Sequence, residues 1–203
     1  MSVARCILIL TRKGNPMSVS VAVKPEVAVR IGTFTDIYRN ILMTATLGQV
    51  EEAAVWYRDA EEVAEEVARN LDTTLEVGAS VVSAFSPRER WSSNVSKSIA
   101  FSLGHEVKGL PNNYKMAQSS LTLGFDALRG PKTNAFARAI AGDADAVVID
   151  IWMMRAAKMT KDSPSQAEYL QLSRAVKNVA KEFGLTPRTT QALIWVIVRG
   201  SAS

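Results

Sequence analysis

Hydrophobic and polar residues recur at helical spacing along most of the chain from Thr35 onward. In the segment "VEEAAVWYRDAEEVAEEVARNL", Val55, Val63 and Val67 recur with a period of about 3.6 residues, opposite a face rich in glutamate. Residues three or four positions apart share one face of an α-helix, so this spacing predicts amphipathic helices. The remainder of the chain follows the same pattern, which predicts an all-α protein.

The first 32 residues follow a different pattern. The segment "SVSVAVKPEVAVRIG" alternates β-branched with other residues, contains Pro25 and ends at Gly32. Alternation with a period of two is typical of a strand, and proline is tolerated at a sheet edge. We therefore expect a short extended or β arm over residues 1–32 and a helical domain over residues 33–203.

Start and stop signals locate several of the later helices. Ser86, Ser163 and Thr186 are each followed by proline, which is typical of an N-cap residue before the first helical position. Gly184 and Gly200 follow apolar periodic segments, where glycine commonly ends a helix. These signals predict one helix after Ser86 and two more near the end of the chain.

Two further signals bear on the middle of the chain. A helix that starts near Asn113 breaks at "RGP" and restarts as "KTNAFARAIAG". Two helices joined by so short a glycine and proline turn predict a helix-hairpin-helix. In "VVIDIWMMRAAKM" the second half is expected to be helical, with Asp150 at its N-terminus.

Composition excludes several classes of protein. The chain has one cysteine, Cys6, so a disulfide framework, a thiolate metal cage and a Cys-ligated iron–sulfur cluster are excluded. No apolar stretch approaches the ~18 residues that a membrane span requires. The net charge of +4 permits an anionic partner such as nucleic acid. We expect a cytoplasmic protein that binds no cofactor.

The segments "GPKT" and "VIDIWMMR" place Gly130, Lys132, Thr133, Asp150 and Arg155 at a spacing found in a known superfamily. Upstream, "VVSAFSPRERWSSNVSKS" and "NNYKMAQSSL" match two more of its conserved segments in the same order. The chain thus resembles the helix-hairpin-helix DNA glycosylases, which include endonuclease III and 8-oxoguanine glycosylase. Their signature is L-P-G-V-G-x-K-T, a helix, and V-D-T-H-x-x-R. The resemblance covers roughly residues 75–160.

The chain departs from this signature at several positions. Leu128 and Arg129 stand where the family has its first glycine and a valine, and Trp152 replaces the usual histidine. The cysteines that hold the cluster of endonuclease III are absent. The overall pattern is most similar to divergent, phage-type members. It implies a location in the cytoplasm of a bacterium or a phage-infected host cell.

The resemblance implies a monomeric enzyme that cleaves the N-glycosidic bond of a damaged or modified base flipped out of DNA. Asp150 then stabilises the positive charge that develops at C1′. Lys132 is the nucleophile of a Schiff-base step that nicks the strand. Two simpler roles stay open: Asp150 as an N-cap alone, and Lys132 as a contact to a DNA phosphate.

The same resemblance assigns further candidate residues to DNA and base binding. Trp91 and Trp152 are candidates for a base pocket, with core packing as the alternative. The DNA-binding candidates are Asn94, Lys115, Arg129, Gly130 and Thr133, and for the two cations a solvated surface position is the alternative. For Asn94 the alternative is an exposed amide on a helix surface.

Three other functions remain open at this point. The same fold is compatible with a phage enzyme that transfers a group onto a modified thymine. It is also compatible with a DNA-binding module without catalytic activity. The third alternative is an unrelated small helical protein.

Overall fold

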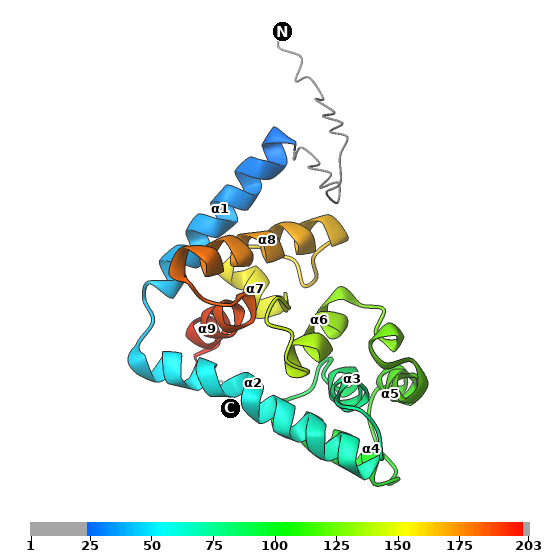
Figure 1. Cartoon of the computed structure of the whole chain (residues 1–203). Helices are drawn as coiled ribbons and strands as arrows, with labels where there is room; N and C mark the ends of the chain where they lie inside the picture. The colour runs from blue at the N-terminus through cyan, green and yellow to red at the C-terminus, as the bar shows by residue number, and fades with distance from the viewer. Residues whose placement is uncertain (1–23, 201–203) are drawn as a thin grey trace, which may run out of the picture.

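The computed structural model describes residues 24–200, and within that range the protein is entirely helical, with no strand (Figure 1). The all-α prediction is therefore confirmed. In chain order the elements are α1 (Pro25–Leu42), α2 (Leu47–Asn70), α3 (Leu75–Phe85), α4 (Trp91–Ser102), α5 (Pro111–Leu123), the 3-10 helix η1 (Gly124–Ala127), α6 (Pro131–Ile140), α7 (Ile151–Ala156), α8 (Gln166–Phe183) and α9 (Pro187–Arg199).

The expected N-terminal arm is wrong for the part of it that the structure describes. Pro25 is the first residue of α1, and the helix continues beyond Gly32 without a break. Val27, Ile31 and Phe34 lie toward the protein on one face of this helix. Val27 and Ile31 also belong to the alternating pattern, so their spacing of four residues fits a period of 2 as well as one of about 3.6. The earlier part of the arm lies outside the described residues.

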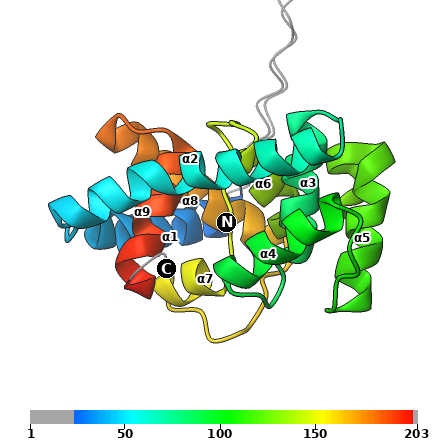
Figure 2. The ribbon, with the colours of Figure 1, turned by 90° about the horizontal axis from the view of Figure 1, so that it is seen from below.

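The buried residues form two clusters, and α2 contributes to both. One cluster lies among α1, α7, α8, α9 and the first half of α2, and includes Tyr38, Leu172 and Ile194. The other lies among α3, α4, α5, α6 and the second half of α2, and includes Val82 and Ile140. In both ribbon views α2 runs from one group of helices to the other (Figures 1 and 2). The molecule therefore has two helical lobes that share one long helix.

The contact between α2 and α3 depends on a glycine. A Cβ atom at Gly78 would lie 2.2 Å from the carbonyl oxygen of Ala64. Ala60, Ala64 and Ala68 line the facing side of α2, so the two helices approach closely along a row of small residues. No other residue type fits at this position unless the helices move apart.

Most of the predicted signals around the last two helices are confirmed. The Thr186 hydroxyl oxygen accepts a 3.1 Å hydrogen bond from the Thr189 N–H at the start of α9. Gly184 and Gly200 end α8 and α9, with φ of 66° and 95°. A positive φ is strained for residues with a Cβ, which explains glycine at both ends.

The expected start of α8 is wrong by two residues. Ser165, and not Ser163, is the N-cap. Its hydroxyl oxygen accepts from the Glu168 N–H at 3.3 Å, and the Glu168 carboxylate accepts from the Ser165 N–H at 2.8 Å. This reciprocal pair satisfies two backbone donors at once. The Glu168 carboxylate also accepts from the Lys161 ammonium at 2.6 Å, which further fixes this start of the helix.

The helix expected after Ser86 is also wrong at its beginning. Ser86 is the C-cap of α3, and its hydroxyl donates to the Ser83 carbonyl oxygen at 2.8 Å. Arg88 has φ of 64°, a left-handed conformation that interrupts the helical path. The chain therefore turns over residues 86–90, and α4 starts only at Trp91.

The predicted hairpin is longer than a tight glycine and proline turn. Between α5 and α6 the chain forms η1 and then an extended segment through Leu128. The Asn134 amide closes this connection by donating to the carbonyl oxygens of Phe125 at 3.0 Å and of Leu128 at 3.4 Å. Helices α5 and α6 each pack against α3. Both helices form, but the connection between them differs from the expected turn, and the helix-hairpin-helix stays a prediction.

Candidate functional site

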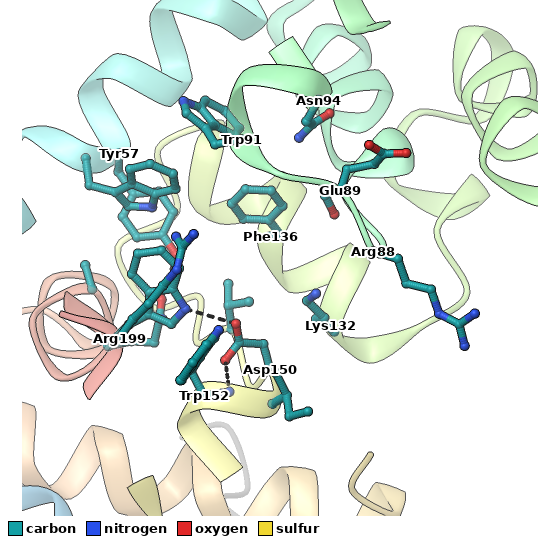
Figure 3. Close-up of a pocket in the computed structure, with 17 residues that line it drawn as sticks. Tyr57, Arg88, Glu89, Trp91, Asn94, Lys132, Phe136, Asp150, Trp152 and Arg199 are labelled. Carbon is teal, nitrogen blue, oxygen red and sulfur yellow. Dashed lines mark hydrogen bonds between the residues drawn. The ribbon is translucent and has the colours of Figure 1, made fainter. Parts of the chain in front are cut away.

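A pocket with a volume of about 300 Å³ lies where the two lobes meet (Figure 3). Its walls come from α2, the 86–90 turn, α4, α6, α9 and the start of α7. Small-molecule sites have volumes of about 300 to 1,000 Å³ and occur preferentially between domains or helices. The pocket therefore has the size and location of a binding site.

Four aromatic side chains form one wall of the pocket. The ring centroids of Trp56 and Trp195 are 5.5 Å apart with an interplanar angle of 25°, which is a stacked arrangement. The ring centroid of Trp91 lies 5.0 Å from that of Trp56, and the ring centroid of Phe136 lies 6.5 Å from that of Trp91. All four residues are half-buried. The wall offers flat apolar surface against which a planar ring can stack.

Asp150 is held in one position by three hydrogen bonds. It is the N-cap of α7, as predicted, and its Oδ1 accepts from the N–H groups of Trp152 at 2.9 Å and Met153 at 3.0 Å. Its Oδ2 accepts from the indole Nε1 of Trp195 at 2.9 Å (Figure 3). A half-buried carboxylate bound by three N–H donors is a fixed negative charge at the pocket wall.

Lys132 lines the same pocket as Asp150. It is the second residue of α6 and is half-buried, and Figure 3 shows it with Asp150 among the side chains that line the pocket. Within residues 24–200, Lys132 forms no ion pair with any acid. An amine and a carboxylate thus face one cavity without being bound to each other.

The 86–90 turn adds a second pair of charges to the pocket. The Glu89 carboxylate forms an ion pair with Lys97 and accepts from the Ser93 hydroxyl at 2.8 Å. The Lys97 ammonium, and after it the Ser93 hydroxyl, lowers the pKa of Glu89. Pro87 is held through its carbonyl oxygen, which accepts from the Asn113 amide at 3.3 Å. The turn is therefore anchored on both sides of Arg88, which also lines the pocket.

Positive charge prevails around the pocket. Arg88, Lys132 and Arg199 line it together with Asp150 and Glu89, and the charge of Glu89 is balanced by Lys97. The guanidinium group of Arg199 lies 4.6 Å from the ring centroid of Trp195, at the end of α9. This charge distribution favours an anionic or phosphate-bearing ligand over a cationic one.

Sequence reasoning missed the contribution of α9. Gln191, Trp195 and Arg199 are four residues apart, so they form a stripe on one helix face, and all three line the pocket. The Tyr57 hydroxyl donates to Gln191 Oε1 at 2.7 Å, and both side chains are buried. The spacing is visible in the sequence, but the apolar residues between these positions are typical of a core helix.

The predicted base-pocket residues and Asn94 all line the pocket. Trp91 belongs to the aromatic wall. The guanidinium group of Arg155 lies over the ring of Trp152, 4.9 Å from the centroid of that ring. Asn94 is only 2% exposed, so the alternative of an exposed helix-surface amide is wrong. Asn94 is buried because its helix, α4, packs against α2 and α3.

The other DNA-binding candidates lie outside the pocket lining. Lys115 on α5 and Arg129 before α6 are exposed. Gly130 is the N-cap of α6, and its carbonyl oxygen accepts from the Thr133 hydroxyl at 3.0 Å. Thr133 is buried, so it stabilises the start of the helix that carries Lys132.

Residues 24–200 contain neither a cluster of metal-ligating side chains nor a helix that could span a membrane. Among residues 24–200, no three side chains of histidine, cysteine, aspartate or glutamate gather where they could hold a metal ion. In the same range no helix combines the length and the apolar character needed to cross a membrane.

Of three comparisons with known proteins, one gives a match, and this match covers the helical part of the chain. No curated protein and no solved structure matches it. One family model matches residues 24–202, which includes both lobes and every residue that lines the pocket. The chain therefore belongs to the family of unknown function DUF7178.

Proposed function

We propose that the protein is a DNA glycosylase-like enzyme that cleaves the N-glycosidic bond of a damaged or modified base turned out of DNA. The observation that carries this proposal is that Lys132 and Asp150 line one pocket, beside a wall of aromatic rings. The resemblance of "GPKT" and "VIDIWMMR" to the helix-hairpin-helix glycosylases assigns catalytic roles to the same two residues.

The aromatic wall supports a nucleobase as the occupant. Stacking of a base on an aromatic side chain contributes ~1–3 kcal/mol, and the wall offers Trp91 and Trp56 for such contact. An aromatic cage for an organic cation is the other common use of such walls. The three cationic side chains that line the pocket disfavour that use and favour a nucleotide with its phosphates.

The chemistry requires a fixed acid beside the sugar and a nucleophile on it. The C1′–N bond breaks and its electron pair leaves with the base, which takes up a proton. The carboxylate of Asp150, fixed by its three donors, stabilises the positive charge on the sugar. The neutral amine of Lys132 forms the new bond to C1′ and gives up its proton. Cleavage of C1′–O4′ then yields the Schiff base, and O4′ takes up a proton.

The start of α6 supports a phosphate contact next to the pocket. The N-cap Gly130 provides no side-chain hydrogen bond, so the first N–H groups of this helix have no cap. Such groups, together with the positive end of the helix dipole, favour an anion. Arg129 and Gly130 are separated from Lys132 only by Pro131, so a phosphate held there lies close to the amine.

The test is release of free base under single-turnover conditions. Oligonucleotides that each contain one damaged or modified base are incubated with the protein, and the products are identified by mass spectrometry. We expect free base from at least one substrate and a loss of about 100-fold or more in Asp150→Asn, since a removed electrostatic stabiliser costs that much. Asp145→Asn, on an exposed acid in the turn before α7, is the matched control.

Two outcomes contradict this proposal. If no oligonucleotide releases a base, the protein is not a glycosylase for the substrates tested. If the nucleoside is recovered with its glycosidic bond intact but with an altered base, the reaction is group transfer at the base.

A further inference from the structure

Gln191 lines the pocket and is only 4% exposed. Its Oε1 accepts the 2.7 Å hydrogen bond from the Tyr57 hydroxyl. Asn94 is the other buried amide in the pocket, and its Oδ1 already accepts from the Ser98 hydroxyl at 3.2 Å. The Asn94 amide is bound by a residue of its own helix, whereas the Gln191 amide is bound by Tyr57 on a different helix, α2.

The contact with Tyr57 determines which end of the Gln191 amide is free. Tyr57 is 5% exposed, and Gln191 Oε1 is the acceptor for its hydroxyl among residues 24–200. Burial raises the pKa of Tyr57 well above its usual value, so the phenol keeps its proton and remains a donor. The amide oxygen of Gln191 is therefore turned toward Tyr57. Its NH₂ group has no hydrogen-bond partner in the described part of the chain.

The NH₂ group of Gln191 is thus a hydrogen-bond donor open to the pocket. A ligand that fills the pocket shields this donor from water, so it must supply an acceptor, because a buried donor without one is costly. The position of Gln191 on α9 indicates how such a ligand lies. Gln191, Trp195 and Arg199 cover about 12 Å of one helix face, at a rise of about 1.5 Å per residue. Along this line Gln191 is buried, whereas Trp195 and Arg199 are half-buried. A nucleotide that enters base first thus meets the amide with the edge of its base.

We propose that Gln191 is a specificity-determining residue, and that the pocket takes bases whose leading edge carries a carbonyl oxygen. The Gln191 NH₂ group donates to that oxygen. A base with an amino group at the same place is rejected, because its N–H donors would face the N–H donors of Gln191. This inference rests on the proposed function, because it assumes that the occupant is a base extruded from DNA.

The experiment compares ligands that differ by one oxygen. The probes are oligonucleotides with a single uracil, or with either of two uracil analogues that each lack one carbonyl oxygen. A 2′-fluoro substituent on the sugar of that nucleotide slows loss of the base during the measurement. Binding is followed by fluorescence, since Trp56, Trp91 and Trp195 line the pocket. For the wild type we expect one analogue to bind about tenfold more weakly than uracil.

Two variants at the contact and one control complete the test. In Gln191→Leu the preference for uracil over that analogue should disappear. This variant leaves the Tyr57 hydroxyl without an acceptor, so Tyr57→Phe is tested as well. Tyr57→Phe releases the amide to rotate, and the preference should fall while Gln191 is retained. Gln166→Leu, on the exposed first turn of α8, should keep the preference of the wild type.

The possible results separate this inference from the proposed function. Equal binding of uracil and both analogues by the wild type overturns the role of Gln191, and so does an unchanged preference in Gln191→Leu and Tyr57→Phe. In either case the proposed function is unaffected, because release of free base is measured separately. If no probe changes the fluorescence and no base is released, the proposed function fails together with this inference.

Discussion

The indole N–H of Trp195 donates a 2.9 Å hydrogen bond to Oδ2 of Asp150. The two residues are 45 positions apart, and the bond links α9 to the residue that begins α7. Oδ1 of the same carboxylate is bound by two N–H groups of α7. The orientation of Asp150 in the pocket therefore depends on both helices, and Trp195 acts as a positioning residue.

Trp195→Phe tests that positioning. Phenylalanine retains an aromatic ring beside Trp56 but has no N–H group, so Oδ2 of Asp150 loses its donor. A hydrogen bond to a charged group contributes about 1.5–3 kcal/mol, so we expect base release to slow by about tenfold or more. The rate of base release is compared for the wild type and the variant under single-turnover conditions.

The control for this variant is Trp152→Phe, which changes a tryptophan of the same pocket whose indole forms no hydrogen bond to the Asp150 carboxylate within residues 24–200. An unchanged rate of base release in Trp195→Phe would show that the indole has only a packing role.

The same contact predicts a non-additive effect on folding. Asparagine is as good an N-cap as aspartate, so Asp150→Asn retains the start of α7. If its amide oxygen remains on the backbone N–H groups, its NH₂ group faces the Trp195 N–H, and two donors meet. We expect Trp195→Phe to destabilise the wild type but to be nearly neutral, or stabilising, in the Asp150→Asn background. Urea unfolding of the four proteins measures this coupling, and additive free energies would contradict it.

Tyr169 predicts how stability depends on alkaline pH. Its hydroxyl donates to the Val147 carbonyl oxygen at 2.8 Å. Burial, with a smaller contribution from the charge of Asp150, raises the pKa of Tyr169 to about 12. An unfolded tyrosine has a pKa of about 10, so above pH 10 the unfolded state loses its proton first. The stabilising effect is therefore complete below pH 10 and is lost as the pH rises to about 12.

Thermal unfolding from pH 8 to pH 12 checks this prediction. For one group the free energy of unfolding should fall by up to ~1.4 kcal/mol per pH unit within that window. Tyr169→Phe should be less stable at pH 8 and should show a shallower fall above pH 10. A slope identical to that of the wild type would mean that Tyr169 ionises equally in both states.

Gly78→Ala tests the close contact of α2 and α3. The added Cβ would lie 2.2 Å from the Ala64 carbonyl oxygen, so the helices must separate, at a cost of about 1–3 kcal/mol or more. Gly32→Ala is the matched control: Gly32 is also inside a helix, and nothing lies within 4 Å of its added Cβ. Alanine should stabilise the protein there by about 0.5–1 kcal/mol. Chemical denaturation measures both, and equal effects would contradict the described packing.

The parts of the fold that could be predicted from the sequence are those set by local interactions. Thr186 and Asp150 bind backbone N–H groups within three residues, so their identity alone indicates a helix start. Where two local solutions compete, the sequence pattern is ambiguous. Ser163 and Ser165 are both suitable caps, and α1 fits an alternating as well as a helical period.

The candidate site could be predicted only in part, because some of its contacts join residues that are far apart in the sequence. Lys132 and Asp150 were identified by their spacing in a segment that resembles the glycosylases, and both line the pocket. Trp195 and Gln191 were missed because their partners are 45 and 134 residues away in the chain. Contacts across such separations depend on how the two lobes pack, and no periodicity reveals them.

The most direct test of the account is borohydride trapping on an oligonucleotide that contains an abasic site, with the cross-linked residue identified by peptide mass spectrometry. We predict one covalent adduct on Lys132, which is lost in Lys132→Ala and retained in the control Lys177→Ala, an exposed lysine of α8 outside the pocket. An adduct on a different residue, or none with the wild type, contradicts the claim that Lys132 and Asp150 act on one sugar in this pocket.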